Sequence, residues 1–200
     1  KKDTIKPSKE FFHINTGWDL KVKEFDLKNG NIRIEDKNLS NKPNKLPFDP
    51  KKFAVLDLNL QFKNANYDST INLDLKRLSL SINNKLNLKE FKGKLNLSDK
   101  GFNANDLELL FNNSVLKANL SAECENLMDF KNFANNVYVN GKISECKLVK
   151  NDFVLFVPKA KPYLVDADLK GDIRGTFGNI KTENLKIKVG SNTILEGSGS

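Results

Sequence analysis

The chain has 200 residues, of which 38% are hydrophobic and 29% charged, with a formal net charge of +8. This length is enough for one domain with a substantial core or for one long continuous sheet. The longest unbroken apolar run, Phe153–Val157, is far shorter than the ~20 residues of a membrane-spanning helix. The positive charge is almost entirely lysine, spread along polar faces among Asp and Asn, which argues against nucleic-acid binding.

Residues 1–35 are predicted to form a leading strand hairpin. Apolar residues alternate with polar ones from Trp18 to Val22, and the parity shifts by one before Phe25, which indicates a β-bulge near Lys23–Glu24. The dipeptide Asn29-Gly30 is a strong signal for a tight turn between the two arms.

The next segment, residues 36–52, is predicted to be a loop because it is rich in proline and lysine and has no hydrophobic periodicity. Within it, Pro47-Phe48-Asp49-Pro50 resembles a local anchor, in which the prolines fix the direction of the chain. A loop of this length inside a compact domain is usually functional or mobile, and its role stays open.

Residues 53–126 carry the clearest pattern, because Leu, Ile and Phe alternate with polar residues at period two. Such alternation is typical of half-buried strands, whereas a helix would place apolar residues three and four apart. We predict about seven short antiparallel strands, with a bulge or a very tight turn across Lys76–Arg77. The predicted apolar face comprises Leu58, Leu60, Phe62, Ile71, Leu73, Leu75, Leu80, Ile82, Leu95, Leu97, Leu107, Leu109, Leu116 and Leu120.

A sheet of this kind raises the question of what covers its apolar face. Burying one Leu or Phe side chain stabilises the fold by roughly 1.5–3 kcal/mol, so leaving about a dozen such side chains exposed to water would cost about 20 kcal/mol. That cost exceeds the usual net stability of a domain. A second sheet, as in an ordinary sandwich, a helix or a bound apolar ligand could each provide the cover, and periodicity does not distinguish among them.

Residues 127–200 are predicted to continue the sheet with short helical inserts. Apolar residues at near-helical spacing predict a short helix within Glu125–Asn136. Asn140-Gly141 indicates a turn between two strands, and Asn151-Asp152 is suited to cap a second helix through Phe153–Val157. The strands expected in this part are Val137–Val139, Ile143–Leu148, Tyr163–Leu169, Asp172–Phe177, Leu185–Val189 and Thr193–Leu195.

No catalytic or metal-binding constellation is recognisable in the sequence. His13 is the only histidine, and neither a nucleophile-elbow motif nor a Gly-rich phosphate loop is present. Cys124 and Cys146 flank the first predicted helix, where they could form a disulfide or remain two buried thiols, and we favour the thiols. We therefore predict no catalytic residue, no metal, no cofactor and no enzymatic activity.

Soft motifs made of turn residues and apolar alternation follow one another along the chain. They are Phe48–Pro50 before Leu56–Leu60, Leu95–Phe102, Leu107–Leu109 before Asn113–Ala118, Ile143–Ser144 before Asn151–Pro158, and Leu169–Thr176 before Gly190–Gly197. Their order over about residues 15–200 resembles the AsmA-like proteins, and most of all the TamB (translocation and assembly module) proteins of Bacteroidota.

The resemblance implies a mainly β fold, a long curved antiparallel sheet whose apolar concave face forms a groove. It implies a periplasmic protein of envelope biogenesis, anchored in the inner membrane by a segment outside this chain, which we expect to be a fragment. Phospholipid acyl chains would be carried along the groove residues named above between the inner and outer membranes, with an outer-membrane barrel protein as partner. Two alternatives stay open: a chaperone-like surface for assembling outer-membrane β-barrel proteins, and a structural β-sandwich of a surface protein.

Overall fold

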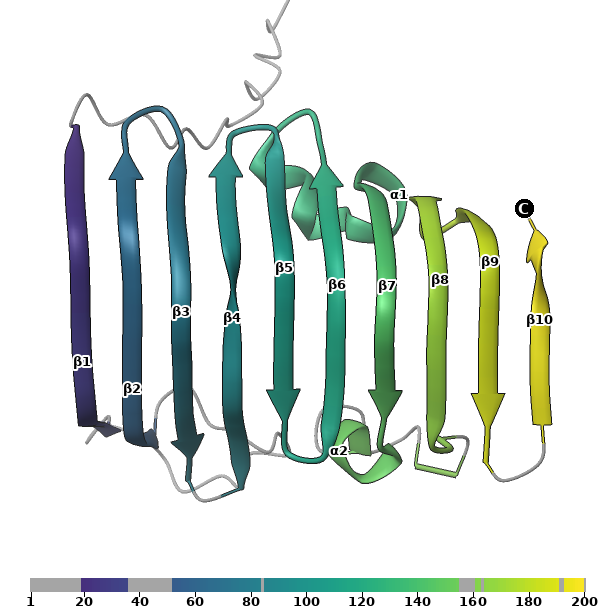
Figure 1. Ribbon diagram of the computed structural model, residues 1–200, viewed down its shortest axis with the longest axis horizontal. Helices are drawn as coiled ribbons and strands as arrows, with labels where there is room; N and C mark the ends of the chain where they lie inside the picture. Colours follow the sequence, from purple (N-terminus) through teal and green to yellow (C-terminus); the bar gives the residue numbers. More distant parts are fainter. Residues whose placement is uncertain are drawn as a thin grey trace, which may run out of the picture.

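The computed structural model describes residues 19–35, 52–83, 85–154, 161–162, 164–190 and 193–199. Within them, ten strands form one open antiparallel sheet in which every strand neighbours the next along the chain (Figure 1). The strands are β1 (Leu20–Glu35), β2 (Lys52–Tyr67), β3 (Ile71–Ile82), β4 (Leu86–Ser98), β5 (Gly101–Phe111), β6 (Ser114–Glu123), β7 (Tyr138–Leu148), β8 (Ala167–Thr176), β9 (Asn179–Val189) and β10 (Thr193–Gly199). The predicted mainly β, antiparallel class is confirmed, and the described residues contain one sheet rather than the two of a sandwich.

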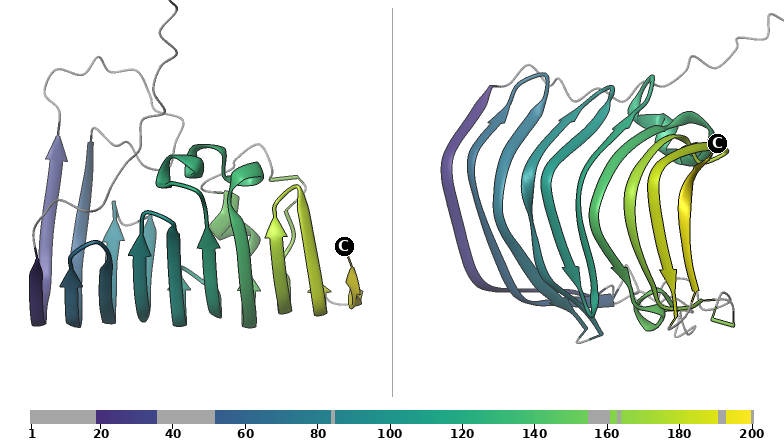
Figure 2. Two further views of the ribbon diagram at one scale, coloured as in Figure 1. Left: turned by 90° about the horizontal axis from the view of Figure 1, so that it is seen from above. Right: turned by 45° about the vertical axis from the view of Figure 1, so that its right-hand side comes forward.

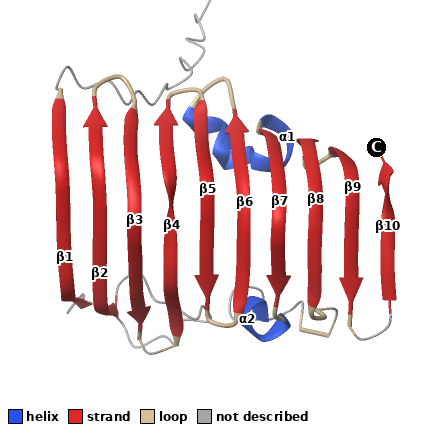
Figure 3. Cartoon of the chain, in the orientation of Figure 1, coloured by secondary structure: helices blue, strands red, loops and turns tan. Residues whose placement is uncertain are grey.

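Three short helices accompany the sheet: η1 (Leu127–Asn132), α1 (Phe133–Asn136) and α2 (Lys150–Val154) (Figure 3). The strands bow along their length, so that the sheet has a concave and a convex side (Figure 2). The first two helices lie on the concave side of the sheet (Figure 2). The third lies at the opposite strand ends (Figure 1).

Polar residues in the left-handed region interrupt the regular strands. Asp57 has a φ of 52° and Asp106 a φ of 53°, and the strand registers shift around both residues. The exposed N–H of Asp106 donates to Asn119 Oδ1 at 2.8 Å, and that of Asp57 donates to Asn31 Oδ1 at 3.3 Å. Such bulges bend a strand and increase its local twist, and these side-chain acceptors keep the displaced backbone donors satisfied.

Residues 53–126 form five long strands, β2 to β6, so the prediction of about seven short strands is wrong. The parity change across Lys76–Arg77 does not separate two strands. It is a bulge within β3, where the register with β4 shifts between Leu75 and Leu78. This region therefore contains fewer and longer strands than the short alternating runs of the sequence indicated.

The tight turns predicted at Asn29-Gly30 and Asn140-Gly141 are also wrong, because both dipeptides lie inside strands. Asn29 has a φ of 54°, and the β1–β2 register shifts beside it. Asn is favoured in tight turns and in bulges for the same reason, since it tolerates positive φ. The predicted hairpin within residues 1–35 is consequently one strand in its described part.

Gly141 occupies its place in β7 for a different reason, which is space. A Cβ on this residue would lie 2.8 Å from Leu120 Cδ2 and 3.0 Å from Ile173 Cγ1, side chains of the two neighbouring strands. The glycine thus allows two large side chains to meet over the backbone of β7.

Other boundaries differ in smaller ways. The bulge predicted at Lys23–Glu24 is wrong, because the β1–β2 pairing keeps one register from Leu20 to Leu27. The strands predicted at Tyr163–Leu169 and Asp172–Phe177 both overlap the single strand β8, which runs only from Ala167 to Thr176.

The first predicted helical insert is confirmed as η1 and α1. The second begins at Lys150, so Asn151 and Asp152 lie inside the helix and their predicted capping role is wrong. Residues 155–157 of that prediction lie outside the described residues. The same is true of His13, of Trp18 and of most of the 36–52 segment.

Candidate functional site

One unbroken row of apolar side chains crosses all ten strands. In each pair of neighbouring strands, the members of this row stand directly opposite each other in the antiparallel register. Cross-strand partners point to the same side of a sheet, so the whole row lies on one surface, which we call the apolar face. From β1 to β10 the row is Leu27, Leu60, Leu78, Phe91, Leu109, Leu116, Cys146, Leu169, Ile187 and Leu195.

The register brings every apolar residue predicted from residues 53–126 onto this face. Parallel rows repeat the central one: Leu73 stands opposite Leu95, and Ile71 stands opposite Leu97. The prediction ended at Leu120 and so omitted the contributions of β1 and of β7 to β10. The same period-two signal in those strands would have found them, for example in Leu185–Val189.

Exposure varies along the apolar face. Ala104, Ala118 and Ala122 are buried, the last with 1% of its surface exposed, and they lie in β5 and β6. At the two edges of the sheet, Leu20 and Leu195 are each 58% exposed. The remaining row members, apart from the buried Cys146, are partly exposed. Outside the end that η1 and α1 occupy (Figure 2), the described residues place no second layer on this face, so a large apolar surface is available for contact.

Aromatic side chains seat the first helical insert on one end of this face. The ring centroid of Phe130 lies 6.2 Å from that of Phe102 in β5 and 5.8 Å from that of Phe133. The ring of Phe133 in turn meets that of Phe177, in the β8–β9 turn, at 5.4 Å. Because Phe102 belongs to the apolar face through its pairing with Leu97, the apolar face is the concave side on which the helices lie in Figure 2.

The insert begins with a well-formed helix cap. The Asn126 side chain accepts from the N–H of Met128 at 2.9 Å, and Asp129 Oδ2 accepts from the N–H of Asn126 at 3.0 Å. This reciprocal pair is a capping box, which provides acceptors for backbone N–H groups that have no partner within the helix. Val137, directly after α1, is fully buried, so the insert is fixed at both of its ends.

The second insert is tied to the other end of the strands by a buried carboxylate. Asp152 is 4% exposed, and its Oδ2 accepts from Ser114 Oγ at 2.7 Å and from the N–H of Asn113 at 2.9 Å. Ser114 Oγ also accepts from the N–H of Val149 at 3.0 Å. The hydrogen bonds of Asp152 join α2 to the turn between β5 and β6, so an insert stands at each end of the strands in the central part of the face.

The opposite, convex side of the sheet is charged, and we call it the polar face. Lys92 Nζ lies 3.1 Å from Glu108 Oε2 and 3.2 Å from Glu90 Oε1, and Lys117 Nζ lies 2.9 Å from Glu145 Oε2. The hydrogen bonds that these two lysines donate to the carboxylates raise the pKa of both ammonium groups. Exposed pairs of this kind add little stability, but they keep the polar face solvated.

Both cysteines are free thiols, so the disulfide left open by the sequence is not formed. Cys146 is buried in the apolar row between Leu116 and Leu169. Cys124 follows β6 and is partly exposed. Burial raises the pKa of each thiol above its usual value, with a smaller contribution from Asp129 at Cys124 and from Asp168 at Cys146. The neutral thiol of Cys146 therefore acts as a small apolar group.

The described residues hold no group of three or more His, Cys, Asp or Glu side chains arranged to bind a metal ion. None of the helices in that part of the chain is long and apolar enough to cross a membrane. The arrangement offers a surface for apolar contact, with charge confined to its reverse side.

No protein family, curated protein or solved structure matches the chain.

Proposed function

We propose that the apolar face carries phospholipid acyl chains as a segment of a lipid-conducting groove. The observation behind this proposal is the unbroken apolar row across ten strands on the concave side of an open sheet. A hydrocarbon chain is the simplest ligand that matches such a surface, because it needs neither hydrogen bonds nor charge. The row contains no polar group stronger than the thiol of Cys146.

Length and energetics favour movement along the row over tight binding at one place. Nine interstrand spacings of about 4.8 Å give the row a length of about 43 Å. One acyl chain spans about half of a ~30 Å hydrocarbon core, so it occupies only part of the row. Each buried CH₂ is worth about 0.8 kcal/mol wherever it lies, so a chain sliding from one strand to the next loses little free energy.

The cellular setting is part of the same proposal and rests on the resemblance to TamB-type proteins. There the chain belongs to a periplasmic bridge, with an inner-membrane anchor outside this sequence and an outer-membrane barrel protein as partner. A phospholipid enters with its acyl chains in the groove and its headgroup toward the open, solvated mouth of the curved sheet.

Photo-crosslinking in cells tests the proposal, using two neighbouring positions of β6. A photoreactive residue at Leu116 lies in the apolar row, and one at Lys117 lies on the polar face of the same strand. We expect a phospholipid adduct at Leu116 and none at Lys117. The two positions are consecutive in the same strand, so they differ chiefly in the face of the sheet they present.

Other outcomes at Leu116 would remove the proposal. A polypeptide adduct would indicate a surface that holds client strands of outer-membrane proteins. The absence of any adduct, with the variant folded and abundant, would indicate that protein outside the described residues seals the apolar face.

A further inference from the structure

A row of charged side chains crosses the polar face from β4 to β10. Each member stands opposite the next in register across β4 to β7, and the sign of charge alternates at every step. These members are Lys92, Glu108, Lys117 and Glu145. Opposite charges facing each other across neighbouring strands attract, so this part of the row neutralises itself.

The alternation fails between β8 and β9, where Lys170 stands directly opposite Lys186. Lys186 Nζ lies 2.5 Å from Glu196 Oε1 of β10, so its charge is partly compensated. Lys170 has no ion pair among the described residues. Glu145, which lies beside Lys170 in the irregular part of β7, already pairs with Lys117. Like charges directly opposite each other in a sheet are destabilising, so this step carries uncompensated positive charge.

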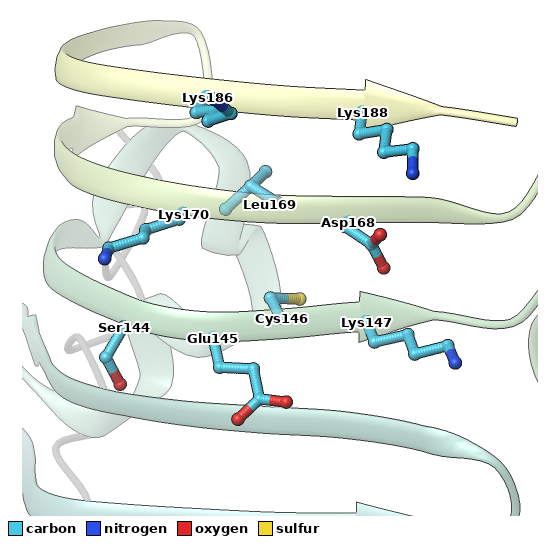
Figure 4. A pocket seen from close by; sticks show the side chains of 9 residues that line it. All are labelled: Ser144, Glu145, Cys146, Lys147, Asp168, Leu169, Lys170, Lys186 and Lys188. Atoms are coloured by element: carbon cyan, nitrogen blue, oxygen red, sulfur yellow. The ribbon is translucent and has the colours of Figure 1, made fainter. Parts of the chain in front are cut away.

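The sheet is also hollowed at this step. The β7–β8 register shifts between Ile143 and Cys146, which leaves two residues of β7 opposite Lys170. A shallow depression opens there on the polar face, and Figure 4 shows its side chains on three neighbouring strands. Its lining includes four lysines and two carboxylates, together with three uncharged residues: Lys147, Lys170, Lys186, Lys188, Glu145, Asp168, Ser144, Cys146 and Leu169.

We propose that this depression binds an anion that carries a phosphate group. A phosphate oxygen placed between Lys170 and Lys186 supplies the negative charge that the alternating row lacks at this step. Lysine ammonium groups bind phosphate through charge-assisted hydrogen bonds, and the flanking Lys147 and Lys188 have the reach of long, flexible side chains. The site lies on the polar face, so it does not depend on any lipid occupying the apolar face.

Nuclear magnetic resonance titration of the full chain with inorganic phosphate at low ionic strength tests the site. We expect saturable shifts of amide signals around the depression in β7, β8 and β9. Lys170→Gln should weaken binding by about tenfold or more, since it removes one charged donor. Lys92→Gln is the matched control, because it removes a lysine of the same row that two carboxylates already compensate, and it should leave the affinity unchanged.

A second arm identifies the source of the phosphate, using cosedimentation with vesicles of phosphatidylcholine and phosphatidylglycerol. Sedimentation that Lys170→Gln abolishes and Lys92→Gln preserves assigns the site to lipid headgroups. Binding of inorganic phosphate without such sedimentation assigns it to a soluble phosphorylated ligand. The proposal is overturned if phosphate causes no saturable shift, or if folded Lys170→Gln binds as well as the unchanged protein.

Discussion

Single positions show how closely the neighbouring strands approach one another. Gly101 begins β5 with a φ of +125°, a backbone conformation that residues other than glycine rarely adopt. A Cβ there would lie 1.9 Å from the carbonyl oxygen of Ala122, which is itself buried on the apolar face. Glycine is required at this position by both the dihedral angle and the space.

Gly101→Ala should therefore destabilise the protein by about 2 kcal/mol or more, because strain at a positive φ adds to a backbone clash. Urea denaturation followed by circular dichroism measures the change in the free energy of unfolding. Gly197→Ala is the control, since nothing lies within 4 Å of a Cβ at that position, and it should change stability by no more than about 0.5 kcal/mol. Equal stability of the two variants would contradict the steric explanation.

At the scale of elements, the two helical inserts are held in different ways. The first packs through the rings of Phe130 and Phe133, whereas the second depends on the carboxylate of Asp152. A buried acceptor shared by a backbone N–H and a hydroxyl couples α2 to the β5–β6 turn, and removing it leaves both donors without that partner.

Asp152→Ala should lower the free energy of unfolding by about 2 kcal/mol, because two buried hydrogen bonds to a carboxylate are lost. Amide hydrogen exchange should also show earlier opening at Asn113, whose backbone N–H loses its acceptor. Lys150 in the same helix is exposed, so Lys150→Ala should have little effect on either measurement. Unchanged exchange at Asn113 in Asp152→Ala would show that the carboxylate does not hold the turn.

The whole molecule separates apolar and charged surfaces onto the two sides of one curved sheet. This separation predicts that a ligand of the apolar face stabilises the fold, because anything that binds only the folded state raises its stability by mass action. Dispersed lysophospholipid below its micelle concentration should raise the melting temperature in proportion to the logarithm of its concentration.

Two variants of β5 distinguish binding at the apolar face from general detergent effects. Leu109→Glu introduces a charge into the apolar row, and the rise in melting temperature should disappear. Asn103→Glu adds the same charge at an exposed position opposite Asn96 and Ser121, and the rise should persist. A rise of equal size in both folded variants would place the ligand elsewhere.

Sequence periodicity was sufficient for much of the architecture. Alternate side chains of a strand point to opposite faces, so runs such as Ile71–Leu75 and Leu116–Leu120 specify both strand conformation and the buried side. The near-helical spacing after Glu125 likewise identified the first insert. These features depend only on neighbours along the chain, which is why they can be read without knowing any tertiary partner.

Tertiary structure alone decided where strands end and what meets across them. Asn29-Gly30 and Asn140-Gly141 satisfy the local requirements of a turn, yet pairing with a long neighbouring strand keeps each within the sheet. The like-charge step between Lys170 and Lys186 is equally invisible in the sequence, since the register and its bulges bring together residues far apart in the chain. The sequence by itself determined which side of each strand carries the apolar side chains. Only long-range hydrogen bonding determined that these sides join into one continuous apolar face.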